Sequence, residues 1–339
     1  MKVVRRIRIK SFSSLSLRIY TIGYPEMGES ILVLLCDGES VLFSVLTDCY
    51  SIDETDGVYN HVHSILENYK ISQIDAFIWT HPDRDHSVGI ENTLNLYDKI
   101  HQAEIFIPEG LIFKGKIGDS FCEEACHAIA FIYSHYSDKG SKMSKRHIHT
   151  VSTDAPETRD LISFDIYADD EDEPMKCKFH FVLPDSASCN HANYWDMELE
   201  HNTMSIVYFI ELRGRKYLFT GDLMDGGARK IEKEFFSKIN YIKIPHHGSC
   251  HSEKFLGMVT NEYYKDDSHH WLTSTVTRFN RSNDPKDRIL KMYSKLGDVF
   301  HITNDKTNKV GCIETIIDII NDECFTNCEG SASQYQSQQ

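Results

Sequence analysis

The first fifty residues have apolar stretches typical of β-strands, and a helical period follows them. β-Branched and aliphatic residues dominate four stretches, which turn signals at Gly23–Pro25 and Asp37–Gly38 help to separate. These predicted strands are Val3–Ile9, Leu15–Ile22, Ile31–Cys36 and Val41–Thr47. Apolar residues then recur three and four positions apart between Val58 and Tyr69, which predicts an amphipathic helix entered through the polar run Asp53–Asp56.

The rest of the chain mixes predicted strands with predicted helices. The strands are Ile74–Thr80, Glu104–Pro108, Leu161–Tyr167, Lys176–Leu183, Met204–Glu211, Lys216–Thr220, Tyr241–Pro245, Trp271–Thr275, Val299–Ile302 and Gly311–Ile317. The helices are Val88–Ile100, Asp119–Tyr136, Gly226–Lys238 and Pro285–Leu296, with one more between Pro245 and Trp271. The acidic run Asp169–Glu173 is predicted to be a solvated hairpin turn.

Two successive β-then-α halves favour an α/β (α+β) fold. We expect two mixed sheets packed face to face with helices outside, an αββα sandwich, as a single domain over residues 1–328. Residues 137–160 are polar and aperiodic, which predicts a loop or insertion. Residues 329–339 are low in complexity and are predicted to form a disordered tail.

The composition narrows the classes of partner. Lys plus Arg number 36 and Asp plus Glu 51, so the net charge is −15. That charge argues against nonspecific adhesion to nucleic acid or anionic membranes, but it leaves room for a local basic groove. The apolar runs are far shorter than a membrane span, and the ten cysteines form no CxxC pair. We therefore expect a reduced, cytoplasmic protein with no membrane partner. The pairs Cys122/Cys126 and Cys324/Cys328 have the spacing of residues on one face of a helix, so we expect them to be packing thiols.

A dense group of potential metal ligands follows the predicted strand that ends at Thr80. Its members are His81, Asp83, Asp85 and His86. A tight loop can turn successive side chains toward one point, and imidazole and carboxylate groups are ligands of divalent cations. The alternative is a polar turn with Asp85 or Ser87 as a helix cap, but a cap needs one such residue rather than four.

Two later strands end in the same kinds of residue. Gly221-Asp222 follows one of them, and His246-His247-Gly248-Ser249 follows the other. All three groups lie at the C-terminal ends of apolar strands, where neighbouring strands would bring them together. The glycines allow backbones to approach closely. Each group alone is a weak signal, but the three in this order are specific.

This order of motifs resembles that of the metallo-β-lactamase-fold hydrolases, and within them the hydrolase domain of bacterial competence DNA-uptake channels and its free-standing relatives. That branch has the motifs HxDxDH, NxxS, TGD and HHGS, then an Asn before a helix that begins with Pro. The matching residues are His81–His86, Asn202 with Ser205, Thr220–Asp222, His246–Ser249, and Asn280 before Pro285. Gly28–Ser30 and Thr47–Asp48 resemble the branch's early turn and first strand end. The resemblance covers about residues 15–318.

The resemblance implies two divalent metal ions, Zn²⁺ or Mn²⁺. His81 and Asp83 would hold one ion, Asp85 and His86 the other; Asp222 would bridge them, and His246 or His247 would complete the second site. The extra histidine that the superfamily supplies before the GD loop has candidates in His201, His180 and His191, although a structural role is the simpler interpretation of each. The implied catalytic residues are Asp85, His247 and Asn280, and the implied substrate-binding residues are Asn202, Ser205, Ser249 and Arg281.

Three ligand carboxylates leave two divalent ions with a residual charge of +1, which a bridging hydroxide would neutralise. The oxygen-rich ligand set makes Mn²⁺ competitive with Zn²⁺. Such a site suits phosphodiesters, so we predict a metal-dependent phosphodiesterase or nuclease that uses a metal-bridging hydroxide and acts on nucleic acid or a small nucleotide. Candidate phosphate-binding residues are Lys139, Lys142, Lys145, Arg146, His147, Arg278 and Arg281, whose alternative role is that of a solvated loop.

Two other functions remain open. One is hydrolysis of a different bond on the same fold, an ester, a lactam or a thioester. The other is a catalytically lapsed scaffold that binds a nucleotide or a protein partner. Fold alone would not decide among them, because one fold hosts many reactions.

Overall fold

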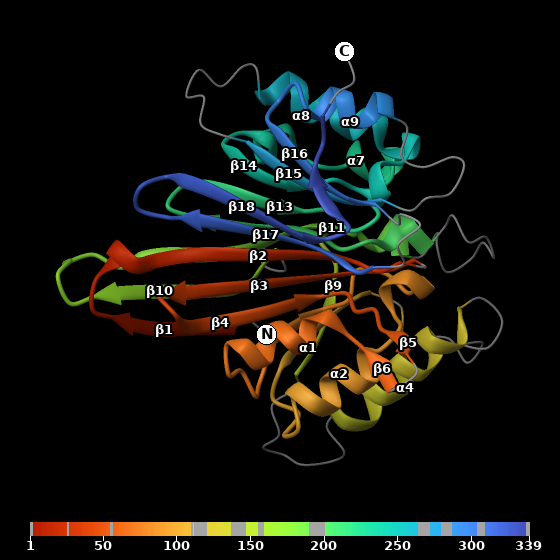
Figure 1. Cartoon of the computed structure of the whole chain (residues 1–339), viewed down its shortest axis with the longest axis horizontal. Helices are drawn as coiled ribbons and strands as arrows, with labels where there is room; N and C mark the ends of the chain where they lie inside the picture. Colours follow the sequence, from red (N-terminus) through yellow and green to blue (C-terminus); the bar gives the residue numbers. More distant parts are fainter. Residues whose placement is uncertain are drawn as a thin grey trace.

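The computed structural model describes residues 3–25, 27–54, 57–109, 111, 121–136, 147–154, 159–189, 201–263, 272–278, 287–303 and 309–336. Over these residues the chain forms two large mixed sheets stacked face to face, with helices on both outer faces (Figure 1). The predicted αββα sandwich is therefore confirmed. None of the described helices has the length and apolar character needed to cross a membrane.

One sheet is built mainly from the first half of the chain. Its strands, in spatial order, are β18 (Glu323–Gly330), β17 (Gly311–Asp318), β2 (Leu15–Gly23), β3 (Glu29–Asp37), β4 (Ser40–Thr47), β7 (Ala76–Ile78), β8 (Glu104–Pro108) and β9 (Ile148–Val151). The pairs from β18 to β4 are antiparallel, whereas β4, β7, β8 and β9 run parallel. Helices α1 (His61–Asn68), α2 (Ile90–Tyr97) and α4 (Glu123–Tyr136) cover its outer face (Figure 1).

The second sheet holds most of the later strands. Its order is β1 (Val3–Ile9), β10 (Asp160–Ala168), β11 (Met175–Leu183), β12 (Val207–Leu212), β13 (Arg215–Phe219), β14 (Ile239–Lys243), β15 (Thr273–Arg278), β16 (Asp298–Thr303) and β19 (Ala332–Gln334). Strands β13 to β16 run parallel. Helices α7 (Asp225–Ala228), α8 (Glu253–Tyr263) and α9 (Asp287–Tyr293) lie on its outer face (Figure 1). Strands β5 (Ile52–Glu54) and β6 (Gly57–Tyr59) form a small hairpin that belongs to neither large sheet.

Burial follows these layers. One apolar cluster fills the space between the sheets, and two others lie between each sheet and its helices. Strand β3 is buried on both faces because it lies between the second sheet and the helices, which explains the unbroken apolar run Ile31–Cys36. The acidic run Asp169–Glu173 joins β10 to β11, so the predicted hairpin turn is confirmed.

Four predictions about local structure were wrong. The stretch predicted as helix Gly226–Lys238 is one turn, α7, which ends at Ala228 and is followed by a 3₁₀ turn at Lys233–Phe236. The predicted loop 137–160 contains β9, whose His149 ring stacks on Phe106 at 4.6 Å.

The other two concern the C-terminus. Residues 329–336, predicted to be disordered, contain the end of β18 and β19, because β19 pairs with β16 and the Tyr335 N–H donates to the Val299 carbonyl at 2.7 Å. Cys324 and Cys328 lie on strand β18 rather than on a helix, and Cys328 is exposed.

Candidate metal centre

The first group of potential ligands occupies the loop after β7. This strand ends at Ile78, and a 3₁₀ turn over Arg84–His86 then folds the loop back on itself. His81 and His86 are both fully buried, with ring centroids 4.2 Å apart. The loop thus directs several ligand-type side chains to one place, as the motif predicts.

The other two groups approach from the opposite sheet. Gly221-Asp222 follows β13 and His246-His247 follows β14, and these strands are parallel neighbours, so their C-terminal ends meet. The His246 N–H donates to the Gly221 carbonyl at 3.2 Å. Gly221 has a φ of +50°, and a Cβ there would lie 3.1 Å from Thr80. A side chain at this position would therefore hold the two sheets apart.

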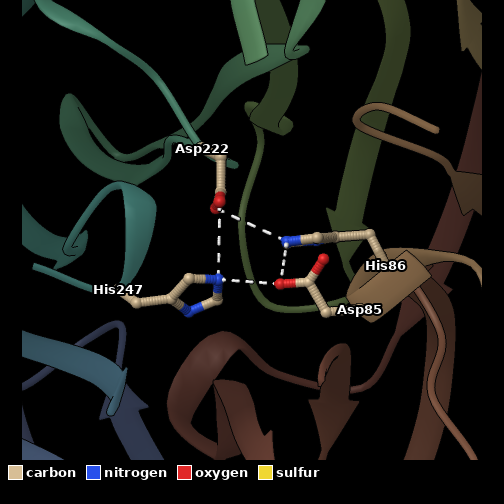
Figure 2. Close-up of side chains that lie close together, drawn as sticks. All are labelled: Asp85, His86, Asp222 and His247. Atoms are coloured by element: carbon tan, nitrogen blue, oxygen red, sulfur yellow. Dashed lines mark ion pairs between the residues drawn. The ribbon is translucent and has the colours of Figure 1, made fainter. Parts of the chain in front are cut away.

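Four side chains converge where these loops meet. Figure 2 shows Asp85 and His86 facing Asp222 and His247. Asp222 Oδ1 lies 3.5 Å from His86 Nε2, and Asp222 Oδ2 lies 3.4 Å from His247 Nε2. Asp85 Oδ2 lies 3.6 Å from His86 Nε2 and 3.2 Å from His247 Nε2. We call these four residues the ligand quartet; their donor atoms lie close enough together for one ion to reach them all.

A second group adjoins the ligand quartet through the contact between the tilted rings of His81 and His86. His81 Nε2 lies 3.5 Å from Asp83 Oδ2, and the other oxygen of Asp83 lies 3.0 Å from His201 Nδ1. Of the two candidates for the extra histidine that the structure describes, His201 and His180, His201 lies at the site. His180 instead pairs with Asp160 and Glu211 on the sheet surface, and His191 lies outside the described residues.

The two adjacent histidines after β14 take different positions. His247 belongs to the ligand quartet and is almost fully buried. His246 Nε2 lies 3.9 Å from Asp222 Oδ2 and 3.5 Å from the Asn202 amide nitrogen, and 18% of its side chain is exposed. The geometry therefore makes His247 the better ligand and places His246 at the rim.

Unsatisfied buried atoms show that these residues fit metal ions. His81 Nε2, His86 Nε2 and Asp222 Oδ1 are buried and have no hydrogen-bond partner among the described residues. An unsatisfied buried polar atom costs about 1–3 kcal/mol. Imidazole nitrogen and carboxylate oxygen are also the donor types that Zn²⁺ and Mn²⁺ accept. The site therefore has the atoms, burial and chemistry of a metal centre.

Hydrogen bonds behind the three buried histidines orient their rings. Thr80 donates its hydroxyl to Asp48 and lies 2.9 Å from His81 Nδ1. Asp48 Oδ2 lies 2.8 Å from His86 Nδ1. Because each Nδ1 faces an acceptor, each ring keeps its proton on Nδ1 and presents Nε2 to the ligand groups.

His247 is held in the same way by a different set of residues. Its Nδ1 lies 2.7 Å from the Thr277 hydroxyl, which in turn donates to Glu29. Glu29 forms an ion pair with Lys243. Glu29 and Asp48 were visible in the sequence only as parts of turn-like motifs, and Lys243, Thr80 and Thr277 carried no signal, because single buried residues on separate strands form no spacing pattern.

The electrostatics of the metal-free site follow from these contacts. Burial alone raises the pKa of Asp222, but His247 and His86 outweigh it and hold that pKa well below its usual range. Burial alone lowers the pKa of His247, but Asp222 and Asp85 outweigh it and raise that pKa to about 9. The pKa of His86 is raised for the same reason. Without metal, the imidazoles of His86 and His247 are therefore both positively charged at neutral pH.

These shifts predict how the stability of the metal-free protein depends on pH. An unfolded histidine has a pKa near 6.5, so the stabilisation from charged His247 is complete below about pH 6.5 and is lost as pH rises through about 9. We expect the Tm in chelator to fall by several degrees between pH 7 and 9.5. Circular dichroism melts would measure it, with His247→Gln as the control whose Tm falls less. A wild-type Tm that does not change over this range would contradict the prediction.

Other predicted site residues are not members of the ligand quartet. Ser249 accepts the His251 N–H at 3.3 Å and caps a 3₁₀ turn, which accounts for its side chain without a substrate. Asn202 and Ser205 are buried in the turn before β12, and Asn202 Oδ1 and Ser205 Oγ have no hydrogen-bond partner among the described residues. Of the candidate phosphate-binding residues, His147 lies 3.6 Å from Glu104 instead. Asn280, Arg281, Lys139, Lys142, Lys145, Arg146 and the side chain of Arg278 lie outside the described residues.

Comparison with known proteins gives distant structural likenesses. No family model and no curated protein matches the sequence. Among solved structures, the metallo-β-lactamase fold protein YhfI from Bacillus subtilis is 10% identical, with a TM-score of 0.33 over 79% of this chain and 74% of that one. Zn²⁺-bound PqqB from Methylobacterium extorquens is 14% identical, with a TM-score of 0.29 over 64% of this chain and 59% of that one. Rm3 metallo-β-lactamase is 10% identical, with a TM-score of 0.28 over 75% of this chain and 77% of that one. The chain therefore resembles these proteins only distantly.

Proposed function

We propose that the protein is a metal-dependent hydrolase that uses two divalent metal ions to cleave phosphodiester bonds. The observation that carries the proposal is the ligand quartet, in which Asp222 lies 3.5 Å from His86 Nε2 and 3.4 Å from His247 Nε2, next to the His81–Asp83 pair. Two adjacent groups of ligand-type side chains suit two ions, and Asp222 is proposed to contribute to both. The order of the motifs along the chain supports the same assignment.

The residues divide between two adjacent sites. Asp85, His86 and His247 would hold one ion, His81 and Asp83 the other, and Asp222 would contribute to both. His201, which lies beside Asp83, is the candidate for an additional ligand. Two divalent ions at this place would supply Lewis acidity and a water molecule acidic enough to ionise near neutral pH.

The buried charge supports two ions rather than one. Asp83, Asp85 and Asp222 contribute three negative charges. Asp48 contributes a fourth, since it accepts hydrogen bonds from the Thr80 N–H and hydroxyl. Glu29 and Lys243 cancel each other. Two divalent ions carry a charge of +4, and the three ligand carboxylates alone would leave a residual charge of +1. With Asp48 included, the four carboxylates carry −4 and the residual charge is zero.

Exposure indicates the side from which substrate enters. The side chains of Asp83, Asp85 and His246 remain 25%, 17% and 18% exposed, whereas His81, His86 and Asp222 are buried. A phosphodiester that enters from the exposed side would meet His246 at the rim, where the ring can donate a hydrogen bond to a phosphate oxygen. Two ions on one phosphate are a recurring arrangement in phosphodiester hydrolysis.

The test is cleavage of bis(p-nitrophenyl) phosphate and of single- and double-stranded DNA with Mn²⁺, with Zn²⁺ and with chelator. We expect cleavage that depends on metal, with close to two ions bound per chain. An ester, a lactam and a thioester substrate are assayed beside them. Two bound ions with cleavage of one of these instead would move the assignment to another bond. If the protein shows no metal binding and no cleavage, the hydrolase proposal is contradicted and a binding scaffold remains.

A further inference from the structure

A fully buried ion pair lies directly behind the ligand quartet. Lys243, the last residue of β14, is 0% exposed, as is Glu29 at the start of β3. Lys243 Nζ lies 2.5 Å from Glu29 Oε1 and 3.9 Å from Asp222 Oδ1. Lysine is almost never fully buried unless it is paired, and removing both charges from water costs several kcal/mol. Because such a pair is costly to bury, its position next to the ligand quartet indicates that it has a function there.

Glu29 connects the ion pair to one metal ligand. Its Oε2 accepts the hydroxyl hydrogen of Thr277, a fully buried residue of β15. The hydroxyl oxygen of Thr277 lies 2.7 Å from His247 Nδ1. The order of contacts is therefore Lys243, Glu29, Thr277, His247.

The ammonium group of Lys243, at the start of this series, determines which group donates in each of the hydrogen bonds that follow. An ammonium group only donates, and an ionised carboxylate only accepts. One oxygen of Glu29 lies against the Lys243 ammonium group, and the other accepts the hydroxyl of Thr277. Thr277 must then use its one hydrogen on Glu29, which leaves its oxygen to accept from His247 Nδ1.

We propose that Lys243, Glu29 and Thr277 form a positioning relay that keeps the proton of His247 on Nδ1 and so leaves Nε2 free to bind a metal ion. The inference rests on the proposed metal-binding function and adds a role for three residues outside the ligand set. Lys243 holds Glu29 in place as the acceptor of the Thr277 hydroxyl. Without that acceptor, the hydroxyl would point toward His247 and favour the tautomer with its proton on Nε2.

The primary test is Thr277→Val, which removes the hydroxyl while keeping the shape of the side chain. We expect the affinity for Zn²⁺ or Mn²⁺ at the site that contains His247 to fall about 10–100-fold, the usual effect of losing a partner behind a metal ligand. Thr277→Ser restores the hydroxyl and should bind within about threefold of wild type. Metal affinity is measured by competition with a chromophoric chelator, and the Tm is measured with and without metal.

A merely structural role for Thr277 gives a different result. In that case Thr277→Val would lower the Tm equally with and without metal and leave the metal affinity unchanged, which would overturn the relay. Lys243→Met provides an independent arm, and the double variant Lys243→Met/Thr277→Val should lose no more affinity than the worse single variant, because the residues act in series. Additive losses would also overturn the relay.

Two further controls keep the outcome clear. Glu29→Gln preserves size and replaces the acceptor-only carboxylate by an amide, so it carries the same test if Thr277→Val does not fold. Wild-type protein that binds no metal would refute the proposed function itself. Wild-type protein that binds two ions, beside a Thr277→Val variant that binds them equally well, would refute the relay alone.

Discussion

Replacing Asp222 by Asn is expected to lower metal-dependent phosphodiester cleavage about 10³-fold. The change removes one negative charge from the group shared by the two sites and turns an acceptor-only carboxylate into an amide. One of its two positions, 3.5 Å from His86 Nε2 or 3.4 Å from His247 Nε2, must then hold an NH₂ group, which cannot bind a cation. Loss of about 4 kcal/mol of charge stabilisation corresponds to that factor. Initial rates at saturating Mn²⁺ would measure it.

The matched control is Asp172→Asn, which makes the same chemical change in the exposed turn between β10 and β11. This variant should retain the wild-type rate and bind two ions. The Asp222 variant should bind its ions more weakly by competition with a chelator, which separates a defect at the metal centre from misfolding. Asp222→Asn protein with wild-type activity and two tightly bound ions would exclude the shared position of this carboxylate.

The metal loops were predictable because each follows a short apolar strand. A parallel strand ends at the same edge of the sheet as its neighbour, so Gly221-Asp222 and His246-His247 had to lie close together once β13 and β14 were recognised. The layer order was predictable from the two successive β-then-α halves of the chain, and the burial of β3 on both faces agrees with it.

The residues behind the ligands were not predictable because they depend on how the two sheets face each other. Glu29 and Asp48 come from one sheet, Lys243 and Thr277 from the other, and the contacts among them cross the sandwich. No period in the sequence reports such a contact.

The choice between the adjacent histidines also lay beyond the sequence. Both follow β14 by a few residues, and both have a positive φ, 48° at His246 and 51° at His247, so the loop rather than a regular period aims their rings. Packing of this loop against Thr277 turns His247 inward, and the Asn202 amide lies beside His246 at the rim. Packing between strands therefore decides which residue can act as a ligand.

That difference predicts unequal effects for the same substitution at neighbouring positions. His247→Gln removes Nε2 from the ligand quartet, where it lies 3.2 Å from Asp85 and 3.4 Å from Asp222. We expect the ion held by the ligand quartet to be lost and cleavage to fall about 10³-fold, since the proposed function requires both ions. Metal content after gel filtration and initial rates would measure the two effects.

His246→Gln is the matched control, because it makes the same change one residue away. His246 is partly exposed and lies farther from Asp222, at 3.9 Å, so this variant should keep both ions. Its effect should appear mainly as a raised KM, since a rim residue that contacts the phosphate contributes to binding, and the loss of one hydrogen bond to a charged group corresponds to about tenfold. The reverse pattern, with the ion lost in His246→Gln and retained in His247→Gln, would assign the metal ligand to His246. It would also remove the reason for the Lys243–Glu29–Thr277 series, because that series ends on His247 alone.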